Sequence, residues 1–327
     1  ASLKRLRQRL PPGVTIMPSA AHPWMDPERE FVRWVDDDAE IYEAFNRIFD
    51  CRGHGWSNLQ SVHVNLPFAS DDEFARLHDA IRLVLPIIPA LAAASPILDG
   101  KIQPEFDARL RVYETNARRI PEMTGRVIPE PVRSRAEYER VILEPLYRAL
   151  APHDPSGILR EEWANARGAI ARFDRNAIEI RIIDAQECPR MDLAVAAATV
   201  ALVRTLVDDP RLGLEDPLDT DRLASIYRDV VTFGDRAVVE DSDYLGRLGL
   251  DRTPLPASEV WGRLLDTRGT SRPGSPWADD LALLLEQGPL ARRLLRMLPP
   301  DPRREDLRSV AATLVTCLET NAPLRVA

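Results

Sequence analysis

The chain has 327 residues, a net charge of −8 and a pI of about 5.3, so nonspecific binding to nucleic acid phosphates is disfavoured. No apolar run approaches the length that spans a bilayer, so a membrane protein is not expected. The three cysteines are far apart and lack metal or CxxC spacing, which favours a reducing cytoplasm over a disulfide framework. Cys188 has two interpretations, a nucleophile or a small buried hydrophobic residue, and we prefer the second.

The first strand is expected at 60–68, because apolar and polar residues alternate there with period two. Val62, Val64 and Leu66 fall on one face. Ser61, His63 and Asn65 fall on the other. Helices are expected at 71–85, 106–118 and 135–150, and the first of these has Phe74, Leu77, Ile81 and Val84 on its core face.

Residues 168–174 and 177–184 flank "DRNA" and are predicted to form a β-hairpin. With Arg175 and Asn176 at the centre of the turn, Arg172 would face Glu179 across the strands, a favourable pair of opposite charges. In the second strand Ile178, Ile180 and Ile182 share one face. Glu179 and Arg181 share the other.

From residue 189 onward the sequence is mostly helical. An apolar stripe at helical spacing is formed by Leu193, Ala196, Val200, Val203 and Val207. Further helices are expected at 219–232, 256–267, 278–297 and 304–320. We therefore expect an α+β core at residues 1–210 and a helical C-terminal portion at 211–327, packed on the same domain.

These elements predict an α+β fold, an antiparallel sheet with an apolar face under helices and an open polar face. The polar face would carry His63, Asn65, Arg172, Glu179 and Arg181. A carboxylate and an imidazole can hold a divalent cation, and arginine donates two hydrogen bonds to phosphate. A solvated or mutually paired surface is the alternative interpretation of the same alternation.

A second candidate region follows Tyr113, where Arg118 and Arg119 end a helix and enter a loop with Thr124, Gly125 and Glu130. Loops on a rigid scaffold often carry binding groups, although cations at a helix C-terminus also complement its dipole. No Walker loop, GxGxxG, HExxH or GxSxG motif occurs. A phosphate site would therefore depend on strand-borne ligands and arginines.

Five segments in register resemble the type 2 glutamate–cysteine ligase family, the carboxylate–amine ligases: "HPWMDP", "NLQSVHVNLPF", "PALAAASPILDG", "YETNARRIPEMTGRVIPEPV" and "NARGAIARFDRNAIEIRIIDAQECP". The resemblance covers about residues 17 to 200. It implies a curved antiparallel sheet with helices on one face, as in glutamine synthetase and the guanidino kinases. It also implies an ATP- and Mg²⁺-dependent ligation in which a carboxylate, often the γ-carboxylate of glutamate, becomes an acyl phosphate that an amine captures.

Carried over by motif, His63 and Glu179 resemble metal-site residues, and Arg181 resembles a phosphate contact. Arg119 and Asn116 would lie near the substrate carboxylate or the nucleotide phosphates. On the same hypothesis Arg181 and Arg119 are the catalytic candidates, and Arg172 contacts the nucleotide. Asn65 and Thr124 are then expected to bind substrate together with Arg119.

One feature departs from the family pattern. Family members usually begin with a strand that carries paired glutamates of an ExE kind, and residues 1–58 contain no such strand. We expect either that this strand precedes the given sequence, which begins with Ala, or that the protein has lost those metal ligands. A non-catalytic ligand-binding or interaction relative and a guanidino-kinase-like phosphotransferase remain alternatives. A homodimer is the working hypothesis for assembly.

Overall fold

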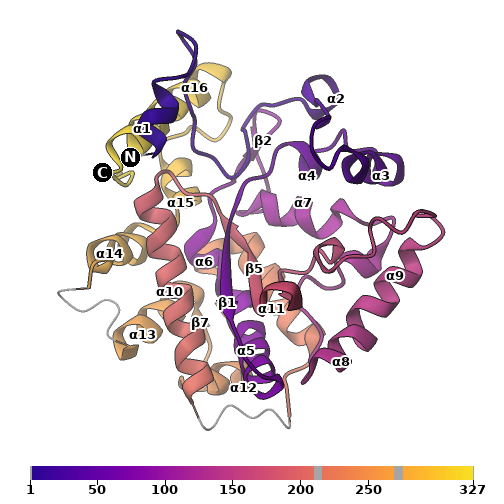
Figure 1. The fold of residues 1–327 in the computed structure, drawn as a ribbon. Coiled ribbons are helices and arrows are strands. Elements are labelled where there is room, and N and C mark those ends of the chain that lie inside the picture. Colours follow the sequence, from indigo (N-terminus) through magenta and orange to yellow (C-terminus); the bar gives the residue numbers. More distant parts are fainter. Residues whose placement is uncertain (1, 210–215, 269–274, 327) are drawn as a thin grey trace.

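A three-stranded antiparallel sheet lies near the centre of the protein (Figure 1). The computed structural model describes residues 2–209, 216–268 and 275–326. The strand order is β1–β5–β4, with β1 at Ser61–Pro67, β5 at Ala177–Asp184 and β4 at Ala169–Arg172. All three strands were predicted. The combination of helices with antiparallel sheets confirms the predicted α+β class.

The predicted hairpin exists, but its predicted register is wrong. Arg172 pairs with Ala177 and Ile170 pairs with Glu179. Residues Phe173–Arg175 form a 3₁₀ turn, and Asn176 follows it in the left-handed region with φ 49°. This connection is longer than the expected two-residue turn. Because the shift is by two residues, each side chain keeps its predicted face.

The helices that cover the apolar face of the sheet are α5 (Asp71–Val84), α6 (Pro89–Ala92) and α10 (Pro189–Asp208). Helix α5 begins at Ser70, whose hydroxyl accepts a hydrogen bond from the backbone N–H of Glu73 and so caps the first turn. Its predicted core face is buried as expected. The partly buried valines of β1 also pack against this core, which confirms the assignment of its two faces.

The predicted stripe of α10 is displaced around the helix. Leu193 is 54% exposed, whereas Met191, Ala194, Ala198 and Leu202 are buried. The helix is apolar on most of its circumference, so periodicity alone does not select the face that contacts the sheet and α5. Helix α10 stands beside β1 in Figure 1.

The main hydrophobic core extends from Phe74 to Leu284 and so includes residues from both predicted portions of the chain. The expected boundary at 210/211 falls in 210–215, outside the described residues. Helices predicted from the periodicity of the C-terminal portion are present, but residues 278–297 form two helices separated at Gly288 and Pro289. These C-terminal helices are α11 (Thr220–Phe233), α12 (Ser242–Arg247), α13 (Ala257–Arg268), α14 (Ala278–Gln287), α15 (Leu290–Arg296) and α16 (Arg304–Thr320).

The remaining elements are short or lie in the first 160 residues. Helix α1 lies beside α16, where Arg7 contacts Glu319 at 2.6 Å, and the two chain ends are close together (Figure 1). In the described parts of the chain, no helix is long and apolar enough to cross a membrane. The other helices are α1 (Ser2–Arg7), α2 (Pro27–Glu30), α3 (Ala39–Phe49), α4 (His54–Ser57), α7 (Ala108–Asn116), α8 (Arg135–Tyr138) and α9 (Glu144–Leu150); the other strands are β2 (Ile97–Leu98), β3 (Lys101–Ile102), β6 (Val238–Val239) and β7 (Leu255–Pro256).

The second face of the sheet is less open than predicted. His63 and Asn65 on the edge strand β1 are exposed, but Glu179 and Arg172 are only 5% and 8% exposed. Helix α7 and the segment 162–168 contribute the groups that cover β5, as the contacts below show. The polar side chains of this face are therefore largely buried at its centre and exposed to solvent at the β1 edge.

Candidate functional site

The candidate site is a cluster of His63, Glu179 and Arg181 on the polar face of the sheet. The carboxylate oxygen Oε1 of Glu179 lies 3.2 Å from Nδ1 of His63 and 2.7 Å from Nε of Arg181. His63 sits at a shift of register between Val62 and Val64, so β1 bulges where its imidazole approaches Glu179. The three groups that were predicted to converge are therefore in direct contact.

Charge and hydrogen bonding hold this cluster in a defined ionisation state. The hydrogen bond from His63 lowers the pKa of Glu179 to about 2, with Arg181 acting in the same direction and burial opposing it. Burial acts against the charge of Arg181, but Tyr113 and Glu179 outweigh it, so its pKa is raised. At neutral pH the cluster is a carboxylate and a guanidinium side by side.

The lowered pKa of Glu179 predicts a pH-dependent contribution to stability. The pKa of Glu179 in the folded chain lies below its usual value of 4.5. The ionised carboxylate therefore contributes its full stabilisation above pH 4.5, and this stabilisation is lost as the pH falls toward 2. We expect the stability difference between wild type and Glu179→Gln to shrink by about 3 kcal/mol over that window. Urea unfolding at several pH values measures it, and a constant difference would contradict the ionised cluster. Glu139→Gln, which replaces an exposed carboxylate paired with Arg135, is the control.

Two segments cover the cluster. The guanidinium of Arg181 donates to the backbone carbonyl of Asn165 at 2.9 Å, and the hydroxyl of Tyr113 on α7 donates to the carbonyl of Arg167 at 3.3 Å. The buried guanidinium of Arg167 donates two hydrogen bonds, of 2.6 and 2.7 Å, to the carboxylate of Glu130. These bonds attach the loop at 121–130 to Arg167, which lies just before β4.

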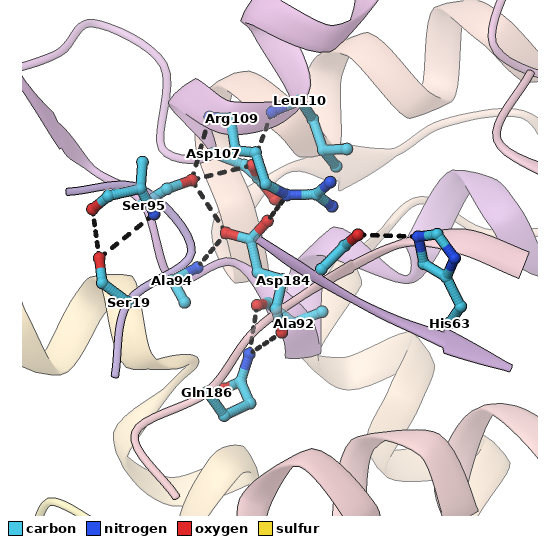
Figure 2. A network of polar contacts seen from close by, with 12 residues as sticks. Ser19, His63, Ala92, Ala94, Ser95, Asp107, Arg109, Leu110, Asp184 and Gln186 are labelled. Atoms are coloured by element: carbon cyan, nitrogen blue, oxygen red, sulfur yellow. Dashed lines mark hydrogen bonds and ion pairs between the residues drawn. The ribbon is translucent and has the colours of Figure 1, made fainter. Parts of the chain in front are cut away.

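Helix α7 is anchored to the end of β5 by a buried polar network (Figure 2). The guanidinium of Arg109 donates to Asp184, and the other carboxylate oxygen of Asp184 accepts bonds of 2.8 and 2.9 Å from Ala94 N and Ser95 Oγ. Asp107 caps α7 through a 3.0 Å bond from Leu110 N, and burial, followed by the charge of Asp184, raises its pKa well above the usual range. This network fixes α7 relative to the strand that carries Glu179 and Arg181.

Arg172 does not join the cluster, contrary to the predicted pairing with Glu179. Its guanidinium bonds to Asp174 at 2.9 Å and lies 3.9 Å from Glu162. The reason is the 3₁₀ turn, which brings Asp174 back beside the end of β4 and moves Arg172 two residues away from Glu179. A role for Arg172 in nucleotide binding therefore has no support from its contacts.

The remaining predicted residues occupy separate positions. Asn65 is exposed and lies directly opposite Glu179 in the register of β1 and β5. Asn116 packs against Gly55, where a Cβ atom would be 2.0 Å from its side-chain oxygen. Arg119 is exposed and donates to the carbonyl of Ile48 at the end of α3. Thr124 is buried, and its hydroxyl has no hydrogen-bond partner.

The predicted metal ligands form only part of a coordination sphere. Within the described ranges, no group of three or more His, Cys, Asp or Glu side chains is placed to hold a metal ion. His63 and Glu179 are brought together, but they contact each other. Mg²⁺ is commonly bound by one or two carboxylates together with substrate phosphates and water. His63 and Glu179 alone would leave most of the coordination sphere of a metal ion to water or to a bound ligand.

The alternative nucleophile, Cys188, is excluded by its environment. Its side chain is fully buried at the start of α10, and burial raises the pKa of the thiol to about 12. The thiolate is the reactive form of cysteine, so this residue is inert near neutral pH. It belongs to the hydrophobic core, as preferred from the sequence.

Tyr113, Asn165 and Arg167 also belong to the site, although the sequence pattern did not predict their roles. The position of Tyr113 could have been predicted from the sequence. Arg109, Tyr113 and Asn116 are spaced by four and three residues, so they lie on one face of α7. Asn165 and Arg167 lie in a segment without periodicity. Their roles depend on backbone carbonyls and on Glu130, which no local pattern reveals.

Comparison with known proteins identifies relatives along nearly the whole chain. A sequence model described as glutamate-cysteine ligase family 2 matches residues 2–312. An uncharacterized protein of Archaeoglobus fulgidus is 33% identical over 309 residues, which cover 94% of this chain and 76% of that protein.

Proposed function

Because the chain belongs to glutamate–cysteine ligase family 2, we propose that it is an ATP-dependent carboxylate–amine ligase. In the proposed reaction a carboxylate oxygen, of the γ-carboxylate of glutamate in the first instance, bonds to the γ-phosphorus of ATP, and ADP leaves. The nitrogen of an amine then bonds to the acyl carbon, phosphate leaves, and the nitrogen loses a proton. The product is a γ-glutamyl-type amide.

The observation that supports this proposal best is that Arg181 and His63 both contact the carboxylate of Glu179 on one sheet face. Phosphoryl transfer spreads negative charge over the transferred group, and a fixed guanidinium stabilises that charge without reorganisation. Glu179 and the carbonyl of Asn165 orient Arg181 before substrate arrives. Arg119, Asn116, Asn65 and Thr124 are proposed to bind the substrates.

Mg²⁺ is proposed to enter with ATP. Glu179 would contribute its carboxylate and His63 its imidazole, and the ion would neutralise phosphate charge when bound. On this proposal the three-stranded sheet belongs to a glutamine-synthetase-like sheet, as the family suggests. The cytoplasm is the proposed compartment and a homodimer the proposed assembly.

The proposal predicts ADP release that requires both a carboxylate and an amine. We expect turnover with Mg·ATP and glutamate when a panel of amines is supplied one by one, and little ADP without an amine. A coupled ADP assay measures it, and mass spectrometry identifies the amide. A stable phosphorylated product would instead indicate a phosphotransferase. Nucleotide binding without turnover for any amine would indicate a non-catalytic relative.

A further inference from the structure

A cavity of about 470 Å³ lies between the segment at 25–34, helix α3 and helix α4. Aromatic rings supply much of its wall, and Phe45 and Trp56 have centroids 5.1 Å apart. Trp34 and Tyr42 are 54% and 47% exposed, although both are large apolar side chains. A hollow of a few hundred Å³ with an aromatic wall is the usual form of a small-molecule site. The aromatic residues of the wall are Phe31, Trp34, Tyr42, Phe45 and Trp56.

The segment that supplies the wall of this cavity is acidic. Residues 25–57 contain nine acidic and four basic residues, a net charge of −5 out of −8 for the whole chain. Glu30 lines the cavity and is exposed. Arg33 also lines it, but it lies 4.0 Å from Glu43, which offsets its charge. Aromatic faces in a negative field attract cations and disfavour anions.

We propose that this cavity binds a small organic cation, an ammonium group attached to an apolar body. The inference deepens the proposed function, because this ligand would be the amine that the ligase joins. The ring faces would hold the ammonium by cation–π attraction, with Glu30 at the wall, and the apolar body would fill the hollow. An α-amino acid is a poorer fit, since its carboxylate would enter the same negative field.

Contacts connect the cavity to the site through α7. Gly55, next to Trp56 on α4, packs so closely on Asn116 that no side chain fits between the two helices. Three residues earlier on α7, Tyr113 lies beside Arg181. Helix α7 thus contacts both the candidate phosphate-binding arginine and helix α4, which carries Trp56 of the cavity wall.

Calorimetry without ATP tests binding independently of turnover. The ligand to be tested is phenethylamine. Two comparison ligands have the same phenylethyl body: 2-phenylethanol, which is neutral, and phenylalanine, which also carries a carboxylate. We expect phenethylamine to bind about tenfold more tightly than either comparison ligand, and Trp34→Ala and Tyr42→Ala each to weaken it about tenfold. Glu30→Gln should weaken phenethylamine but not 2-phenylethanol. The control is Phe233→Ala, which removes an equally exposed ring on α11, far from this wall in sequence.

Equal affinities for the three compounds, or unchanged affinity in both aromatic variants, would overturn the inference. Tighter binding of phenylalanine would also overturn it and would make the cavity an amino-acid site. Amine binding without amine-dependent ADP release would support the cavity and reject the ligase. Ligase activity with no binding of phenethylamine would support the ligase and reject the cavity.

Discussion

Replacing Asp184 with alanine is expected to lower the free energy of unfolding by about 3–5 kcal/mol, the usual cost of breaking a buried ion pair on one side. The side chain of Arg109 is 2% exposed and that of Asp184 is fully buried. The substitution would leave the guanidinium of Arg109 and the N–H of Ala94 without their acceptor, and the hydroxyl of Ser95 with Asp107 as its remaining acceptor. Urea unfolding of wild type and variant measures the difference.

Glu139→Ala is the matched control for this prediction. It breaks a pair with Arg135 at 2.8 Å, as short as many buried pairs, but both side chains are about half exposed. An exposed pair of this kind contributes roughly 0.5 kcal/mol. Losses of similar size in the two variants would contradict the idea that the network of Asp184 anchors α7. The charge of Asp107 also acts on Arg109, so Asp184→Ala combined with Asp107→Asn should be less stable than either single variant.

The sheet could be predicted because its strands alternate strictly, whereas its register could not. Alternation assigns Glu179, Arg181 and His63 to one face with no knowledge of the rest of the chain. The register depends on the turn, and the turn depends on Asn176 adopting the left-handed region after a 3₁₀ turn. A two-residue turn and this longer one agree equally well with the alternation, which is why Arg172 was placed opposite Glu179.

Helix positions were predictable where the helix has one apolar face and not where it is apolar throughout. In helix α5 the four apolar residues of the predicted core face are buried, although its polar residues His78, Asp79 and Arg82 are buried as well. In α10 small and branched apolar residues surround the axis, so contacts made by the sheet and α5 select the buried face. The break between α14 and α15 at Gly288 and Pro289 follows from the left-handed backbone of Gly288, with φ 84°, before a proline.

The candidate site was found in part because its three central residues lie on regular strands. Its covering groups come from loops and from α7, and their positions depend on buried polar contacts between distant segments. Arg109 and Asp184 are separated by 75 residues, and Arg167 and Glu130 by 37. Each of these pairs consists of residue types that are common on surfaces, so neither can be recognised without the fold.

Replacing Arg181 with lysine is expected to lower kcat about 100-fold while leaving the fold intact, if the proposed ligase reaction is correct. The guanidinium is held by Glu179 at 2.7 Å and by the carbonyl of Asn165 at 2.9 Å, so its remaining N–H groups have a fixed direction. Lysine keeps the positive charge, but its single ammonium group on a flexible chain cannot make the two fixed hydrogen bonds of the planar guanidinium. Steady-state kinetics of ADP release, with ATP, glutamate and amine varied in turn, measures kcat and each KM.

Arg172→Lys is the matched control, because Arg172 is a largely buried arginine on the same face, one strand away. Its guanidinium is bound to Asp174 and not to Glu179, so turnover should stay near that of wild type. Equal losses in the two variants would show that kcat reports the packing of the face and not the action of Arg181. A larger loss in Arg172→Lys would restore the nucleotide contact first predicted for that residue and would remove Arg181 from the centre of the mechanism.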